Sequence, residues 1–392
     1  MTEPAQDPRV LRDPYATYAA MRSVCPVQSL PAGGGGRTDY LVTGYAEARA
    51  ALNDPRLSKD TSVFFAGKES RRRLHPAVAR TMLATDPPRH TRLRQLVTRE
   101  FTTGAVKQLR PFIARTTDEL LDQWPADGPL DFVARLAVPL PVMVICQLLG
   151  VPRADRPTVQ GWSAELFAAG EPDVIDAASH ALAGYLEDLI AAKRMNPGDS
   201  LLDRLVAARD GEDRLSEEEL VSLAVLLLVA GHETTTNALG NALLALFQHP
   251  DVLRRLRDAP HEIPAALDEL LRFDSAVGVA TFRFTTQAVV LGGTEVPAGV
   301  PVLVALGAAN RDPARFPEPD RLDPGRDAAA HLAFGHGVHR CVGAPLAMAE
   351  MEIALRAVLT RFPRIRLALP PDRLEWRRTR LVRGLASLPV LV

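Results

Sequence analysis

The chain has 392 residues, of which 47% are hydrophobic, so it is long enough to bury a sizeable core, either as one large domain or as two or three ordinary ones. Its net charge of −1 gives no reason to expect a nucleic acid or an acidic membrane surface as its partner. The cysteines, Cys25, Cys146 and Cys341, are odd in number and far apart, which argues against a disulfide framework and for a reducing compartment.

The N-terminus has neither the basic region nor the apolar region of a secretory signal. The longest apolar run, 223–230, is far shorter than the roughly 20 residues that a membrane span needs. We therefore expect a cytoplasmic protein without a membrane anchor.

The first 60 residues predict a strand at 39–43 and a helix at 45–53. Consecutive glycines occupy 33–36. A phosphate-binding loop would need a strand before these glycines and a helix N-terminus after them, and neither is convincing, so we expect a flexible hairpin loop. Residues 57–84 have the pattern of a long irregular connection, which in a compact domain is usually functional or disordered.

A helix is predicted to begin after Asp-Pro-Pro at 86–88, since proline fits the first turn of a helix. On this helix His90 and Arg94 share a face, where two cationic donors would suit an anionic group. Alone, such a pair is more often a surface feature. Residues 105–215 are then expected to be mainly helical, with breaks at prolines and glycines.

The strongest predicted helix covers 215–248, where Ser216 and Glu219 form a capping box. Its length of roughly 50 Å and its apolar composition indicate a helix that crosses the core of a large domain. The sequence inserts Ala-Gly-His-Glu-Thr-Thr-Thr into it at 230–236, although a buried acid is costly unless it is partnered or used. The His-Glu pair does not continue as a zinc-protease motif, because Thr236 takes the place of the second histidine.

The next predicted helix begins at Pro264 and carries Glu269 and Arg272 on one face. This spacing normally indicates a surface ion pair worth less than about 1 kcal/mol. Short strands are then predicted at 282–285, at 288–291 and after 297–299.

The stretch 334–343 reads Phe-Gly-His-Gly-Val-His-Arg-Cys-Val-Gly. A metal-binding thiolate at Cys341 needs backbone N–H groups aimed at its sulfur, and glycines permit this close approach of the main chain. A zinc site from His336, His339 and Cys341 is the competing interpretation, but it lacks the paired spacing that closes a tetrahedral site. The helix predicted at 344–361 points its N-terminus at the thiolate, and the tail after it alternates like strands.

The stretch 334–343 matches the haem-thiolate signature of cytochromes P450, Phe-Gly-x-Gly-x-His-x-Cys-x-Gly, at every fixed position. The run at 230–236 resembles the oxygen-activating helix of that family, and Glu269 with Arg272 resembles its Glu-x-x-Arg helix. The whole chain thus resembles a soluble cytochrome P450 of the bacterial type. The resemblance implies a mainly α fold with a small β-rich lobe, a single domain over residues 1–392, and haem b as cofactor.

The resemblance also implies roles for individual residues. Those expected to contact the haem are Cys341 as the iron ligand, Phe334, Gly335, Gly343 and Ala230, and those expected to bind its propionates are His90, Arg94, Arg283 and His339. Glu233 and Thr234 would be the acid and the alcohol that supply protons, while Ala230 and Gly231 leave room for dioxygen. In some relatives a carboxylate stands where this chain has Thr281, so the hydrogen bonding near Arg283 stays open.

The substrate pocket is implied in the same way. The residues expected to line it are Met82, Leu83, Leu226, Val229, Ala230, Val277, Val279, Leu381 and Val382. The connection 57–84 would cover this pocket, and 167–176 would form a mobile lid over it. A third arginine, Arg321, would join Glu269 and Arg272 in locking the fold on the side of the cysteine loop.

These implications predict a monooxygenase that hydroxylates or epoxidises a lipophilic small molecule, such as a natural-product intermediate, with O₂. Because no flavin or nicotinamide motif is present, its two electrons would come from a ferredoxin with an NAD(P)H-dependent reductase, which would dock through arginines such as Arg72, Arg92 and Arg340. The alternative is a haem-thiolate isomerase or coupling enzyme without an external reductant, or a ligand sensor. The pair of Glu233 and Thr234 favours the monooxygenase, because only oxygen activation needs a proton path.

Overall fold

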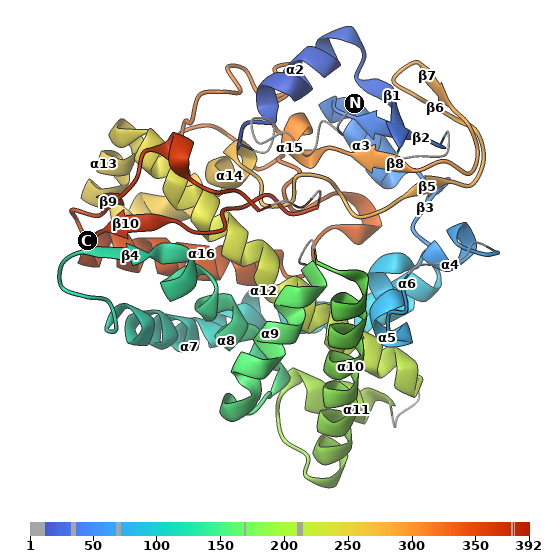
Figure 1. Ribbon diagram of the computed structural model, residues 1–392, viewed down its shortest axis with the longest axis horizontal. Helices are drawn as coiled ribbons and strands as arrows, with labels where there is room; N and C mark the ends of the chain where they lie inside the picture. The colour runs from blue at the N-terminus through green and yellow to red at the C-terminus, as the bar shows by residue number, and fades with distance from the viewer. Residues whose placement is uncertain are drawn as a thin grey trace. The chain divides into compact units, whose positions relative to one another are not determined.

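A computed structural model of the protein describes residues 12–32, 37–67, 72–167, 170–209, 215–377, 379 and 381–392. In these ranges the chain is mainly α-helical with small β-sheets, so the predicted fold class is confirmed (Figure 1). The chain divides into two compact units, each made of separate segments. Unit 1 comprises Met1–Ser58, Ala114–Ala137 and Thr234–Val392, and unit 2 comprises Lys59–Ile113 and Val138–Glu233.

The β-rich part of the chain lies in unit 1. Strands β1 (Val27–Ala32) and β2 (Arg37–Val42) form an antiparallel hairpin, and β8 (Val302–Val304) pairs with β2 in parallel. The hairpin expected around the glycines is therefore confirmed by its strands, while 33–36 lie outside the described residues. Helix α3 (Tyr45–Asn53), which has the predicted bounds, shares a hydrophobic core with β2 and β8 (Figure 1).

Shorter strands complete unit 1. β3 (Leu57–Ser58) pairs with β5 (Phe284–Thr285), and β6 (Val289–Leu291) pairs with β7 (Thr294–Val296). Gly292 and Gly293 connect β6 to β7 with φ angles of 53° and 80°, a turn that glycine makes at low cost. β10 (Pro389–Leu391) lies between β4 (Pro129–Asp131) and β9 (Arg366–Leu367). The strands predicted at 282–285 and 288–291 are thus present in shorter form.

Unit 1 also contains several helices. They are α2 (Tyr15–Val24), the π-helical η4 (Val133–Ala137), α13 (Pro250–Asp258), η6 (Pro260–Glu262), α14 (Ile263–Phe273), α15 (Leu306–Ala309), η7 (Gly337–His339), α16 (Ala344–Arg361) and η8 (Pro371–Arg373). Helix α16 has the bounds that the sequence predicts, and it packs against α14. This packing buries the α16 residues Ala354, Leu355 and Val358 almost completely.

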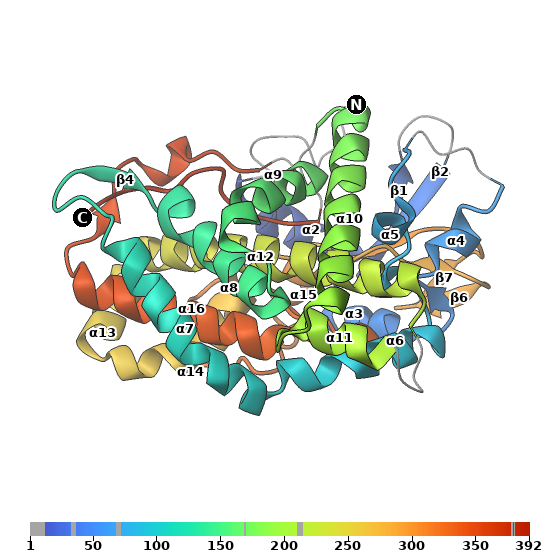
Figure 2. The ribbon, with the colours of Figure 1, turned by 90° about the horizontal axis from the view of Figure 1, so that it is seen from below.

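Unit 2 is helical in its described residues. Its helices are α4 (Thr61–Phe64), α5 (Pro76–Ala79), η2 (Met82–Ala84), α6 (Arg89–Thr98), η3 (Arg99–Phe101), α8 (Pro139–Leu149), η5 (Arg153–Asp155), α9 (Arg156–Phe167), α10 (Pro172–Met195) and α11 (Leu201–Arg209). Figure 2 shows α10 beside α9 and α11, with which it packs. At the joint of α10 and α11, Lys193 Nζ and Asp203 Oδ2 form a buried ion pair at 2.9 Å.

Of the sequence predictions for 57–84 and 167–176, the first needs correction and the second lies partly outside the described residues. The connection 57–84 is not irregular throughout, because it contains β3, α4, α5 and η2. These elements are too short for their periodicity to be seen in the sequence. Of the expected lid, 168–169 lie outside the described residues, and the residues from Pro172 onward begin α10.

Helices α7 (Thr103–Leu121) and α12 (Glu217–Gln248) each have residues in both units, and the division of α12 falls between Glu233 and Thr234. The predicted capping box of α12 is confirmed. Ser216 N donates to Glu219 Oε2 at 3.2 Å, and Glu219 N donates to Ser216 Oγ at 3.1 Å. By length and composition α12 could also cross a membrane, but 72% of its most apolar window is buried, as in the core helix of a soluble protein.

Candidate functional site

In unit 1, the loop before α16 presents an accessible thiol. Cys341 is exposed, and its N–H donates to the carbonyl of Phe334 at 2.8 Å. Gly335 and Gly337 both have a φ of 71°, a conformation that favours glycine. At Gly337 a Cβ would also lie 2.9 Å from the carbonyl oxygen of Leu52 in α3, so glycine is needed for the close packing of the loop. The loop is therefore fixed by its main chain, and the sulfur stays accessible.

The surroundings of the thiol bear on the competing zinc interpretation. Helix α16 begins at Ala344, so its N-terminal N–H groups favour a thiolate at this position. In the described part of the chain, no three His, Cys, Asp or Glu side chains lie together so that they could hold a metal ion. The zinc interpretation therefore gains no support.

One face of α12 keeps accessible surface in a helix that is otherwise buried. Ala230 is exposed and Leu226, Val229 and Thr234 are partly exposed, and these residues follow one another at helical spacing. Glu233, in contrast, is buried at 6% exposure. The accessible face of α12 thus carries small apolar side chains and the Thr234 residue.

Two residues beside this face have surroundings that the sequence did not reveal. The Oε1 atom of Glu233 lies 3.9 Å from Nε2 of His232, whose Nδ1 lies 2.9 Å from the carbonyl oxygen of Leu228. A Cβ on Gly231 would lie 2.8 Å from Cγ1 of Ile145 in α8. Close helix packing therefore accounts for Gly231, and the space for dioxygen that we expected of it stays a prediction.

The expected propionate ligands are divided between the units. His90, at 2% exposure, and the partly exposed Arg94 lie on α6 in unit 2, whereas Arg283, at 4% exposure, and the partly exposed His339 lie in unit 1. Burial, together with the charges of Arg94 and Lys59, lowers the pKa of His90 to about 4. This shift favours the neutral imidazole of His90, and the role of His90 and Arg94 as propionate ligands stays a prediction.

The expected pocket residues are also divided. Met82 is buried and Leu83 is partly buried on η2, in the same unit as Leu226 and Val229. In unit 1, Val277 and Val382 form an antiparallel bridge, and Gly278 N donates to the carbonyl of Leu381 at 3.1 Å. Val279 and Leu381 are partly exposed there. Unit 1 thus brings the segment at 277–279 and the turn at 381–382 together.

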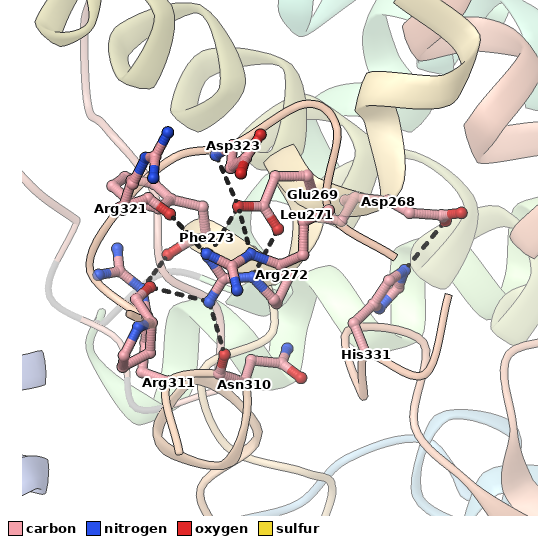
Figure 3. A network of polar contacts seen from close by, with 12 residues as sticks. Asp268, Glu269, Leu271, Arg272, Phe273, Asn310, Arg311, Arg321, Asp323 and His331 are labelled. Atoms are coloured by element: carbon pink, nitrogen blue, oxygen red, sulfur yellow. Dashed lines mark hydrogen bonds and ion pairs between the residues drawn. The ribbon is translucent and has the colours of Figure 1, made fainter. Parts of the chain in front are cut away.

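Glu269 and Arg272 of α14 form a fully buried network instead of a surface pair. The Nε of Arg272 lies 2.6 Å from Oε2 of Glu269, and both side chains are 0% exposed. Arg272 also donates to the carbonyl oxygen of Asn310 at 2.9 Å (Figure 3). It donates to the carbonyl oxygen of Pro319 as well, also at 2.9 Å. Such a desolvated pair holds its position only when further hydrogen bonds satisfy both groups, as they do here.

The third arginine of this network is Arg326, and the expectation of Arg321 was wrong. The Nε of Arg326 lies 3.1 Å from Oε1 of Glu269, which also accepts from the N–H of Asp323 at 2.9 Å. The side chain of Arg321 is 64% exposed and faces Glu318 at 3.5 Å, and only its carbonyl oxygen reaches Arg272. The sequence signal for Arg326 is the Asp-Pro-Gly sequence just before it, which favours a turn. This turn reverses the chain so that Arg326 reaches the carboxylate of Glu269.

Comparison with known proteins identifies the family to which this chain is similar. The family model of cytochrome P450 matches residues 173–382. The cytochrome P450 monooxygenase PikC of Streptomyces venezuelae is 45% identical over 96% of this chain and 91% of its own. A vitamin D(3) 25-hydroxylase of Pseudonocardia autotrophica is 46% identical over 97% of this chain and 94% of its own. The solved structure of the tirandamycin C-bound P450 monooxygenase TamI has a TM-score of 0.91 at 45% identity and covers 98% of both chains.

The chain belongs to the cytochrome P450 family, and it has the fold of that family. It is accordingly a P450 monooxygenase of the kind found in bacterial secondary metabolism, and its cofactor is haem b. The residues present fit this group. An accessible thiol on a glycine-supported loop suits the iron, because a thiolate is a haem ligand that needs the close approach of the main chain which glycines permit.

Proposed function

We propose that this monooxygenase hydroxylates or epoxidises a lipophilic natural-product intermediate in the cytoplasm, with two electrons from a ferredoxin and its NAD(P)H-dependent reductase. The observation that carries the proposal is the apolar face of α12 around Thr234, in a chain that also presents the thiol of Cys341. Relatives named PikC, a monooxygenase, and mycinamicin IV hydroxylase/epoxidase support the reaction type, the latter at 44% identity over 91% of this chain.

In this proposal the thiolate of Cys341 would hold the haem iron. The bound haem supplies the activation of O₂, which the electron-rich thiolate promotes. The residues that would hold the propionates are Arg283, His339, His90 and Arg94. A neutral His90 serves as an N–H donor to a carboxylate oxygen, so it can take part without first being protonated.

Thr234 and Glu233 control the protons in the apolar surroundings of α12. The hydroxyl of Thr234, on the accessible face, orders the proton donor beside the reacting oxygen. Glu233 is the acid of the pair, and its Oε1 lies 3.9 Å from Nε2 of His232. The low polarity of Leu226, Val229 and Ala230 excludes bulk water from this face.

The ligand assignment is tested by the spectrum of the reduced holoenzyme under carbon monoxide. We expect the red-shifted Soret band of a thiolate-bound haem, its loss in Cys341→Ser, and its retention in Cys25→Ser, a partly buried thiol elsewhere in unit 1. A Cys341→Ser enzyme that kept the band would exclude Cys341 as the ligand.

The reaction class is tested by turnover of a panel of lipophilic compounds with NAD(P)H, a [2Fe–2S] ferredoxin and its reductase. We expect oxygenated product only when all of these are present, with one atom of ¹⁸O from labelled O₂ in the product. Product formed without any reductant would favour the isomerase or coupling enzyme instead.

A further inference from the structure

A hairpin near the C-terminus ends in a turn that lies against other parts of unit 1. Its arms are joined by bonds from Arg377 N to Gly384 O at 2.9 Å and from Ala386 N to Glu375 O at 2.8 Å. Near its tip, Val382 N donates to Oγ1 of Thr379 at 3.0 Å. We call residues 381–384 the C-terminal turn.

The C-terminal turn lies on the face of α12 that carries Thr234. Asn241 Nδ2 donates to the carbonyl oxygen of Arg383 at 3.1 Å. A Cβ on Gly384 would lie 1.7 Å from Oδ1 of Asn237, so this glycine is in direct contact with the helix. Asn237 and Asn241 follow Thr234 at positions i+3 and i+7, which share its face, and one helical turn advances about 5.4 Å. The turn therefore begins roughly one helical turn from Thr234.

The C-terminal turn also pairs with the segment at 276–278. Arg383 N donates to Ala276 O at 2.7 Å, and Gly278 N donates to Leu381 O at 3.1 Å. Val277 and Leu381 nevertheless remain partly exposed. The turn and this segment thus make one apolar wall next to the Thr234 face of α12.

A mostly buried cluster of polar side chains contacts this wall through Arg383. The Nε of Arg383, a residue of the turn itself, lies 2.7 Å from Oδ1 of Asp274, and both side chains are 12% exposed. The hydroxyl of Tyr15 in α2 donates to the same carboxylate oxygen at 2.7 Å. The guanidinium of Arg383 lies 3.8 Å from the centre of the Trp376 ring, in the first arm of the hairpin.

Two groups of this cluster, the guanidinium of Arg383 and the hydroxyl of Tyr15, keep their protons. Burial alone would lower the pKa of Arg383, but the neighbouring Asp274 raises it. Burial and Asp274 together raise the pKa of the Tyr15 hydroxyl, so it stays a donor. Arg383 and Tyr15 therefore remain hydrogen-bond donors to the carboxylate of Asp274.

We propose that Asp274, Arg383 and Tyr15 are positioning residues that fix the C-terminal turn against α12 and thereby determine how a substrate is placed beside Thr234. The proposal rests on the proposed haem site. Buried ion pairs contribute little net stability compared with apolar packing, but the loss of one partner leaves a buried charge that must move toward water. Because the cation belongs to the turn, removal of Asp274 displaces the wall with it.

The test compares two ligands of ferric haem, imidazole and 4-phenylimidazole, in the holoenzyme. Both bind the iron through nitrogen and shift the Soret band. Only 4-phenylimidazole also carries a phenyl ring, which must fit against the wall. In Asp274→Asn we expect the Kd of 4-phenylimidazole to rise about fivefold or more, and that of imidazole to change less than about twofold. Tyr15→Phe removes only one hydroxyl and should raise the ratio of the two Kd values, 4-phenylimidazole over imidazole, by a smaller factor. This second variant keeps the test possible if Asp274→Asn does not fold.

The matched control is Asp203→Asn, which breaks the buried pair of Lys193 and Asp203 in unit 2. It should lower the Tm as Asp274→Asn does while leaving the ratio of the two Kd values unchanged. The proposal is overturned if the ratio of the two Kd values is unchanged in both Asp274→Asn and Tyr15→Phe. It is also overturned if Asp274→Asn weakens the binding of both ligands equally, or if the ratio changes in Asp203→Asn. The carbon monoxide spectrum of each variant separates these outcomes from failure of the haem site itself.

Discussion

Thr234 differs from the two threonines that follow it in its exposure. Thr235 and Thr236 are 4% and 3% exposed, whereas Thr234 lies on the accessible face of α12. Of the three threonines, Thr234 is therefore the one that we propose to order a proton donor beside a bound substrate. We expect Thr234→Ala to uncouple the enzyme, with electrons diverted to hydrogen peroxide and product per NAD(P)H lowered at least about tenfold, since positioned proton transfer contributes roughly 10²–10⁴ in rate.

The control for this prediction is Thr236→Ala, which removes the same groups from a buried position on the same helix. NAD(P)H consumption, peroxide and product are measured together in each variant. An unchanged product yield per NAD(P)H in Thr234→Ala, or equal uncoupling in Thr236→Ala, would contradict the role of the Thr234 hydroxyl.

Glu350 of α16 is an acid that the sequence analysis did not single out, because it falls on a helix whose other inward residues are apolar. It is 1% exposed, and its Oε2 has no hydrogen-bond partner in the part of the chain that the structure describes. Burial raises its pKa well above 4.5, so the native protein keeps the proton that the unfolded chain releases. Stability should therefore fall as the pH rises from 4.5 through the native pKa.

Glu350→Gln should remove this pH dependence, since an amide has nearly the same shape and no charge to bury. We expect the Tm of the variant relative to the wild type to increase steadily between pH 5 and pH 9. Glu352→Gln, which changes an acid paired with Arg356 on the same helix at 2.9 Å, should show no such increase. A constant Tm difference for Glu350→Gln across this range would show that Glu350 ionises in the native protein.

At the scale of elements, α14 is tied to the segment 310–326 by the network around Glu269. Arg326 is 13% exposed and bonds to Glu269 and to the carbonyl oxygen of Pro317, whereas Arg321 is 64% exposed. Loss of hydrogen bonds to a buried charge costs about 1–3 kcal/mol each, and exposed substitutions usually stay within about 0.5 kcal/mol. We expect Arg326→Ala to lower the free energy of unfolding by roughly 2–4 kcal/mol and Arg321→Ala by less than about 0.5 kcal/mol.

Urea denaturation of the two holoenzyme variants gives this comparison directly. The Soret band reports loss of haem, and far-UV circular dichroism reports loss of helix. Equal stability of the two variants would mean that the bond from Arg326 to Glu269 does not hold these elements together in solution.

Elements with strong local signals were predicted well. The capping box of α12, the bounds of α3 and α16 and the β-hairpin around the glycines all depend on residues near each other in sequence. The choice of Arg326 over Arg321 depended on how a turn folds back on α14, which periodicity does not show. The short helices α4 and α5 are below the length at which a helical pattern can be recognised.

At the scale of the whole molecule, the motif residues could be named from sequence because each stands in a local pattern of a known family. The contact of Gly384 with Asn237 and the pair of Asp274 and Arg383 join residues more than 100 positions apart. No local pattern marks such partners. The same holds for the two compact units, whose segments alternate along the chain, so the predicted single domain over 1–392 stays a prediction.

Electrostatic attraction of a ferredoxin cannot come from the molecule as a whole, because its net charge is only −1. We propose that local positive groups near the thiolate loop attract the proposed ferredoxin. Of the arginines predicted for docking, Arg340 is exposed and directly precedes Cys341 in the sequence. Arg340 is therefore the strongest of these candidates.

We expect Arg340→Glu to lower the second-order rate constant of reduction by a [2Fe–2S] ferredoxin about tenfold at low salt, since charge reversal at a docking site acts mainly on the encounter rate. The difference from the wild type should shrink as ionic strength approaches 1 M, where the Debye length is about 3 Å. Arg364→Glu makes the same charge change beyond the far end of α16, whose 18 residues span about 27 Å, and should leave the rate within about twofold. Stopped-flow reduction under carbon monoxide measures all three proteins, and a salt-independent rate in the wild type would show that docking is not electrostatic.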